Sequence, residues 1–100
     1  MNNKIIQLSK SLSQLGFSVT EETNSDYNYM CCKCNTLDIT IQCIFNKEYN
    51  IYIKQRFKET KHLPSHSVEF TFYNVNSNHM PHITTMIIAL YEASNNQLGE

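Results

Sequence analysis

The alternation of apolar and polar side chains between residues 37 and 45 restricts the fold of this chain more than any other feature. Every second position is apolar, and the set is Leu37, Ile39, Ile41, Cys43 and Phe45. The residues between them are polar, except for Ile44. Because successive side chains of a strand point to opposite faces, the pattern predicts a strand with one apolar and one polar face. Such strands form antiparallel sheets that are covered on one side only.

Two later segments repeat this alternation and predict further strands. Between residues 49 and 57 the inward positions are Tyr49, Ile51, Ile53 and Phe57, and the outward ones are Asn50, Tyr52, Lys54 and Arg56. Between residues 68 and 73 the inward positions are Val68, Phe70 and Phe72, and the outward ones are Glu69, Thr71 and Tyr73. The sequence also predicts short strands at 17–20 and 29–34, loops at 21–28 and 58–66, and turns at 35–36 and 46–48.

Helical spacing of apolar residues predicts one helix on each side of the strands. The first helix runs from about Asn3 to Leu15, with Asn2 or Asn3 as N-cap and an apolar face of Ile5, Leu8, Leu12 and Leu15. Gly16 stands where a left-handed residue ends a helix, so Phe17 is expected to fold back onto the last turn. The second helix runs from about Pro81 to Ala93, with a face of Ile83, Met86, Ile87, Leu90 and Ser94.

These elements predict a two-layer α+β sandwich. An N-terminal helix, a four- to five-stranded antiparallel sheet and a C-terminal helix follow one another, and both helices cover the same face of the sheet. The chain of 100 residues has the length of a single domain, 1–100, with 95–100 as a frayed tail. The other face of the sheet is expected to be exposed to solvent or used by a partner.

The composition excludes several classes of protein. The net charge of −1 excludes a generally basic nucleic-acid binder, and two glycines exclude a glycine-rich phosphate loop. No apolar run approaches the roughly 20 residues that a membrane span needs. The first residues turn polar by Gln7, so they lack the apolar centre of a signal peptide. We therefore expect a cytoplasmic protein without a membrane partner.

The cysteines raise the question of a zinc site. Cys31-x2-Cys34 and His62-x3-His66 have the spacing of zinc ligands, but the gap between these halves is far longer than in a zinc finger. On a strand, moreover, Cys31 and Cys34 face opposite sides. We expect no metal and no cofactor, and we interpret the thiols as small buried side chains, namely Cys31, Cys32, Cys34 and Cys43.

The sequence offers no catalytic constellation. The four histidines fall in loops or at a helix start: His62, His66, His79 and His82. No Ser or Cys stands in the glycine-flanked turn that a nucleophile elbow requires. Asp38 and Glu69 could be neighbours on the outward face, but such an exposed pair has nothing to exclude water. We expect a protein that is not an enzyme and has no catalytic residues.

An outward-facing strip of basic and aromatic residues is the strongest candidate site. Its members are Tyr52, Lys54, Arg56, Lys58 and Tyr73. From Lys54 to His66 the formal charge is +3, whereas Glu21, Glu22 and Asp26 give −3 in the expected loop 21–28. Tyr and Arg are frequent in protein interfaces, and a divided charge can steer a protein partner. Aromatic rings with basic neighbours on an open sheet also bind nucleic acids, with Lys61 as a further contact.

We expect a small module that binds a protein and acts by covering a functional surface of a larger host enzyme. The chain has twelve Asn and ten Ile but only two Ala, which is typical of AT-rich genomes such as those of many phages. Its layout is similar to that of some anti-CRISPR proteins, which implies a phage or mobile-element inhibitor of a host defence enzyme. The layout is also similar to that of some type III secretion chaperones, which implies a homodimer. A nucleic-acid-binding domain is the other alternative.

Overall fold

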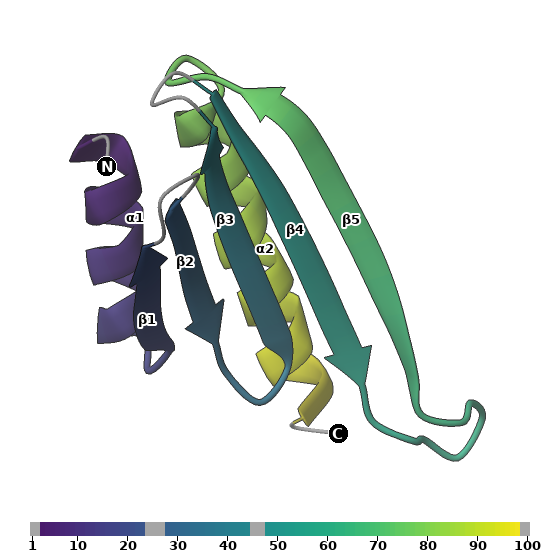
Figure 1. Cartoon of the computed structure of the whole chain (residues 1–100). Coiled ribbons are helices and arrows are strands. Elements are labelled where there is room, and N and C mark those ends of the chain that lie inside the picture. Colours follow the sequence, from purple (N-terminus) through teal and green to yellow (C-terminus); the bar gives the residue numbers. More distant parts are fainter. Residues whose placement is uncertain (1–2, 24–27, 45–47, 99–100) are drawn as a thin grey trace.

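A computed structural model describes residues 3–23, 28–44 and 48–98 (Figure 1). The elements, in chain order, are α1 (Asn3–Gln14), β1 (Ser18–Thr23), β2 (Asn28–Lys33), β3 (Leu37–Ile44), β4 (Glu48–Phe57), β5 (His66–Val75) and α2 (Met80–Leu98). The five strands form one antiparallel sheet in the order β1-β2-β3-β4-β5. Both helices lie on one face of this sheet, so the predicted two-layer α+β fold is confirmed.

Helix α1 ends as its sequence predicts. Gly16 has a φ of 102°, in the left-handed region that a residue without Cβ adopts readily. The amide of Gly16 donates to the carbonyl of Ser13, and the amide of Phe17 donates to the carbonyl of Leu12 (both 3.0 Å). These two bonds satisfy carbonyls that the end of a helix leaves open. They also turn the chain so that Phe17 is buried, with its ring 5.4 Å from that of Tyr91 on α2.

The register of the strands aligns the apolar side chains in rows across the covered face. One row contains Cys32, Ile39, Ile53 and Phe70, and the next contains Met30, Ile41, Ile51 and Phe72. The members from β2, β3 and β4 are almost completely buried. Apolar residues of both helices close the core from the other side, and these are Ile5, Leu8, Leu12, Ile83 and Ile87.

The helix layer covers the strands unequally. Helix α1 packs against β1 and β2, and α2 packs chiefly on β4. Strand β5 lies beyond the two helices, and its hairpin with β4 extends past the rest of the molecule (Figure 1). Val68 is therefore 40% exposed although it is on the helix side of the sheet, and Phe70 and Phe72 are only half-buried. Their predicted direction is consistent with the register, but their cover is incomplete.

One polar residue lies in the covered face. Gln55 on β4 is 4% exposed, and its amide donates to Ser94 Oγ (2.9 Å) and to the carbonyl of Leu90 (3.3 Å) on α2. A buried amide without such partners would destabilise the fold, so these bonds explain why Gln is tolerated here. They also fix the position of α2 along β4.

The prediction of a loop over 21–28 is wrong at both ends. Strand β1 continues to Thr23 and β2 begins at Asn28, so Glu21 pairs with Met30, and Glu22 with Tyr29. The backbone of β1 finds its hydrogen-bonding partner in β2, and exposed carboxylates at a sheet edge stay in water. The expected acidic loop is therefore not formed by these two residues, which lie on opposite faces of the sheet.

Other boundaries differ by a few residues. Helix α2 continues to Leu98, beyond the expected end at Ala93, and β5 already begins at His66. Several predicted positions lie outside the described residues, namely Asn2, Asp26, Phe45, Asn46 and Lys47. Within the described part of the chain, no helix is long and apolar enough to cross a membrane.

Candidate functional site

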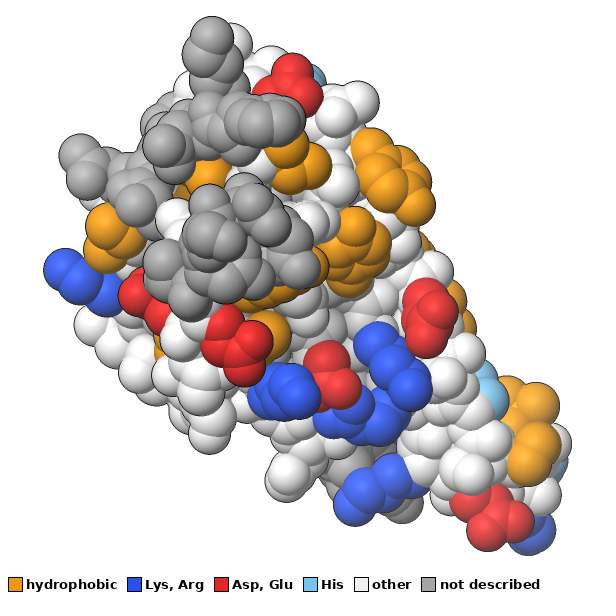
Figure 2. Space-filling view, in the orientation of Figure 1, with side chains coloured by type: hydrophobic (Ala, Val, Ile, Leu, Met, Phe, Trp, Pro, Cys, Tyr) orange, Lys and Arg blue, Asp and Glu red, His pale blue; other side chains and the backbone are white. Residues whose placement is uncertain are grey.

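The face of the sheet opposite the helices is open, and its side chains also form rows. One row is charged and contains Lys33, Asp38, Lys54 and Glu69. The next row contains Cys31, Thr40, Tyr52 and Thr71. Figure 2 shows this face, with basic and acidic side chains mixed in one area and hydrophobic side chains above it.

Aromatic and amide side chains form a continuous band across the open face. The rings of Tyr52 and Tyr73 meet edge to face, with centroids 6.5 Å apart and an interplanar angle of 90°. The hydroxyl of Tyr52 donates to Gln42 Oε1, and Gln42 Nε2 donates to the hydroxyl of Tyr29 (both 3.4 Å). We call Tyr29, Gln42, Tyr52 and Tyr73 the aromatic band. The structure thus brings together the two predicted tyrosines and adds two residues that sequence reasoning missed.

Tyr73 is the most exposed member of the aromatic band. Its exposed fraction is 67%, higher than that of any other large hydrophobic residue in the described chain. Its ring is also held from one side by Tyr52, and a preordered aromatic side chain loses little entropy on binding. The arrangement suits a contact with another surface.

The side chain of Arg56 forms hydrogen bonds with other residues of the same chain. Its guanidinium donates to Asp38 Oδ2 and to the carbonyls of Cys34 (2.7 Å) and Asn35 (3.2 Å). The hydrogen bond to Asp38 is the main cause that raises the pKa of Arg56 above its usual value. These bonds clamp the β2–β3 turn to β4, and the backbone amide of Arg56 adds a bond to the carbonyl of Thr36 (2.8 Å). Arg56 is therefore a structural clamp, and its donors are engaged.

The charged row alternates in sign. Register neighbours along it are Lys33 and Asp38, then Asp38 and Lys54, then Lys54 and Glu69. Opposite charges on neighbouring strands attract each other, so the basic side chains of this row are locally compensated. Asp38 and Glu69 both face outward, but they are not direct neighbours, because β4 separates their strands and Lys54 stands between them.

A shallow hollow lies between the charged row and the aromatic band. Its volume is about 290 Å³, and its lining includes Asp38, Thr40, Tyr52, Lys54 and Glu69. The lining offers hydrogen-bond donors and acceptors on the open face, and it includes both positively and negatively charged side chains. Such a surface accommodates a polar or charged side chain of a partner.

Lys58 lies apart from the other predicted site residues. It follows the end of β4 and begins the loop that joins β4 to β5, where Lys61 and His62 are exposed as well. It lies six positions after Tyr52, which corresponds to about 20 Å along an extended chain. At the base of this loop the rings of Phe57 and His66 stack with centroids 4.8 Å apart. The predicted strip therefore divides into Tyr52, Lys54 and Tyr73 on the open face, Arg56 in the clamp, and Lys58 in the hairpin.

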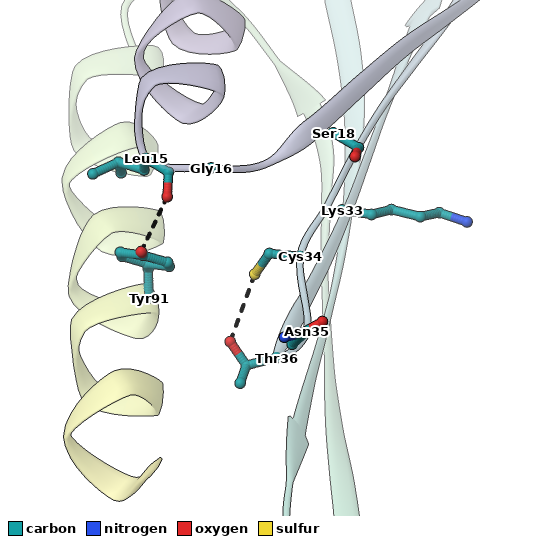
Figure 3. Close-up of a pocket in the computed structure, with 8 residues that line it drawn as sticks. All are labelled: Leu15, Gly16, Ser18, Lys33, Cys34, Asn35, Thr36 and Tyr91. Carbon is teal, nitrogen blue, oxygen red and sulfur yellow. Dashed lines mark hydrogen bonds between the residues drawn. The ribbon is translucent and has the colours of Figure 1, made fainter. Parts of the chain in front are cut away.

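A second hollow, of about 430 Å³, opens where the end of α1 meets the β2–β3 turn and α2 (Figure 3). Tyr91 donates from its hydroxyl to the carbonyl of Leu15 (3.1 Å), and Cys34 Sγ lies 3.6 Å from Thr36 Oγ1. Figure 3 shows the side chain of Lys33 extending away from these groups. The described lining contains no His, Asp or Glu, so it offers the Cys34 thiol no base.

The neighbouring thiols Cys31 and Cys32 have different surroundings. Cys31 is half-buried on the open face, whereas Cys32 is fully buried on the covered face. Burial, with a smaller contribution from Cys31, raises the pKa of Cys32 to about 11. A thiol with so high a pKa stays protonated and is a poor metal ligand. Among the described residues, no three His, Cys, Asp or Glu side chains are grouped so that they could hold a metal ion.

Comparison of the chain with known protein families, with characterised proteins and with solved structures finds no match.

Proposed function

We propose that this protein is a non-enzymatic module that binds another protein through the open face of its sheet. The observation that carries the proposal is the Tyr52–Tyr73 pair, in which the exposed ring of Tyr73 contacts the half-buried ring of Tyr52 beside a hollow with hydrogen-bond donors and acceptors. The centres of protein interfaces are enriched in Tyr, and polar residues surround them. The aromatic band with the charged row beside it has this composition.

The charges of the open face favour a protein over a nucleic acid. A phosphate backbone is bound by cations that are free to replace its counterions. Arg56 is engaged by Asp38 and two carbonyls, and Lys54 stands between Asp38 and Glu69. A row of alternating charges instead fits a partner surface with the complementary alternation, which gives specificity and orientation.

The mode of action that we propose is occlusion. A flat sheet face that binds a larger enzyme blocks whatever functional surface it covers, and it needs no chemistry of its own. The small size of the protein, and an amino-acid composition typical of AT-rich genomes, support the proposal that it is a phage or mobile-element inhibitor of a host defence enzyme.

The proposal is tested by affinity capture from a lysate of host cells, with and without nuclease. Three forms of the tagged protein are compared, namely the wild type, the double variant Tyr52→Ala/Tyr73→Ala, and Leu15→Ala. Leu15 is a suitable control because it is 40% exposed and lies at the end of α1, away from the open face. We expect a stoichiometric protein partner that survives nuclease, and a loss of at least about tenfold in affinity for the double variant only.

Two outcomes contradict the proposal. If the double variant retains the full affinity of the wild type, the site is not on the aromatic band. If only nucleic acid is captured, and moderate salt releases it, binding through phosphates is indicated and the exposed Lys58 and Lys61 become the site.

A further inference from the structure

Strand β5 is a long edge of the sheet with little of the usual protection. It has ten residues, and among the described strands only β4 pairs with it. Natural edge strands are protected against pairing by charged side chains, especially Lys, by Pro, by bulges or by shortness. Of the ten described residues of β5, Glu69 is the only Asp, Glu, Lys or Arg, and none is Pro. The one irregularity is a shift in register near its end, where Asn74 has a φ of 57°.

The opposite edge, β1, differs in each of these respects. It has six residues, carries the exposed Glu21 and Glu22, and lies next to α1. A strand that is short and acidic offers little to a further strand. The molecule therefore protects one edge of its sheet and leaves the other open.

The helix side of β5 also carries apolar surface that nothing in the described structure covers completely. Val68 is 40% exposed, and Phe70 and Phe72 are half-buried. These three residues alternate along the strand and therefore form one stripe parallel to the open edge. A strand added to this edge would cover the stripe with its own side chains while it pairs with the backbone.

We propose that the partner of this edge is β5 of a second copy, and that two chains form a dimer with one continuous ten-stranded sheet. The two strands run antiparallel about a twofold axis that is perpendicular to the sheet and passes between the two Phe70 residues. Val68 then lies opposite Phe72 of the second copy, and Glu69 lies opposite Thr71. On the helix side apolar residues meet apolar residues, and on the open side polar residues meet polar residues.

The charge of β5 and its irregularity disfavour the two neighbouring registers. A pairing centred on Glu69 would place the two carboxylates opposite each other, which is destabilising. A pairing centred on Thr71 would place Val68 opposite Asn74, where the left-handed backbone interrupts the strand. With Phe70 at the centre, each carboxylate faces an uncharged hydroxyl, and the paired segment ends just where the regular strand ends. The edge is thus complementary to itself, as a twofold interface requires.

The dimer goes beyond the proposed function, because Val68 and Phe70 are on the helix side and the aromatic band is on the other. It would nevertheless place both open faces on the same side of one large sheet, with the Tyr73 residues near the seam. A partner with two equivalent surfaces would then be bound more tightly than by one copy.

The test compares Val68→Lys with Leu15→Lys by sedimentation of the full chain over a range of concentrations, with a reducing agent to prevent disulfides. Both positions are 40% exposed, so an isolated chain tolerates either change, but only Val68 lies on the β5 edge. We expect the wild type and Leu15→Lys at twice the chain mass of 11.7 kDa, and Val68→Lys at the chain mass. Circular dichroism verifies that each variant is folded.

Amide hydrogen exchange provides a second measurement on the wild type. Backbone amides of β5 should exchange more slowly as the concentration rises, and those of β1 should not change. The register is tested by Thr71→Lys, which brings an ammonium opposite Glu69 of the second copy and should tighten the dimer by about two- to fivefold.

A wild type that sediments at the chain mass at every concentration overturns the proposal, and the edge is then left for a different partner. The proposal is also overturned if Val68→Lys and Leu15→Lys form dimers of equal affinity. A dimer weakened by Thr71→Lys overturns the register centred on Phe70.

Discussion

Neighbouring residues on one strand show how differently the two faces of this sheet are used. Ile53 is 1% exposed and packs in the core, whereas Tyr52 beside it is half-exposed and belongs to the aromatic band. Likewise, Cys32 on β2 is fully buried, whereas Cys31 beside it is half-buried on the open face. The backbone is shared, so the difference comes from what covers each face. The covered face stabilises the fold, and the open face is free to carry recognition.

The largest expected effect is the truncation of a core residue on the covered face. Replacing Ile53 by Ala removes buried methyl groups and leaves a cavity, which should lower the free energy of unfolding by about 3 kcal/mol. Replacing Lys54, the next residue, by Ala should change it by less than about 0.5 kcal/mol. Urea unfolding of both variants measures the difference. Equal losses would mean that the open face is itself packed against something.

A smaller effect is expected from pH through Cys32. Its pKa is raised from 9.0 to about 11 in the folded chain, so below pH 9.0 the thiol is protonated in both states. Between pH 9.0 and about 11 the thiol ionises in the unfolded chain only, which favours unfolding. The stabilisation present below pH 9.0 is therefore lost as pH rises to about 11, by on the order of 2 kcal/mol.

The measurement compares the wild type with Cys32→Ala at about pH 8 and about pH 11, under reducing conditions. Other groups that titrate in this range are common to both proteins, so their effect cancels in the difference. The wild type should lose more of its stability than the variant does. A difference that is the same at both pH values would contradict the burial of this thiol.

A still smaller loss than that at Cys32 is expected on the open face, at the ion pair of Arg56 and Asp38. Their side chains are 37% and 29% exposed, so solvent screens the attraction. Asp38→Ala should lower the free energy of unfolding by about 0.5–1 kcal/mol, and less at high salt. The carbonyls of Cys34 and Asn35 still hold the guanidinium in this variant. A loss as large as that of Ile53→Ala would show that the clamp is essential to the sheet.

The strands and helices could be predicted because each has one covered face. Alternation at 37–45 and 49–57, and helical spacing at 3–15, follow directly from that condition. Gly16 marked the end of α1 because few other residues adopt its backbone angles. That Glu21 and Glu22 belong to β1 and pair with β2 could not be predicted in the same way. Side chains at an exposed edge need not alternate between apolar and polar, so no pattern marks the strand there.

The contacts of the candidate site depend on register, which the sequence pattern does not contain. Asp38 and Cys34 lie 18 and 22 residues from Arg56, so the clamp becomes visible only once β3 and β4 are aligned. Tyr52 and Tyr73 were predicted to share a face, and their contact again depends on alignment. Gln55 is a polar residue, so the sequence gives no sign that it is buried. Its burial follows only from the position of α2.

The order of the strands has a consequence for how the protein is made. Each strand from β2 to β5 pairs with the strand that precedes it in the chain, so each new strand can join the growing sheet as it leaves the ribosome. Helix α2 follows all five strands, and until it is synthesised the core residues of β4 that it packs on have no cover. At about 5–20 residues per second, residues 76–98, which extend from β5 to the end of α2, take roughly one to five seconds to synthesise. During that interval the apolar side chains of β4 lack the cover that α2 gives them in the finished fold.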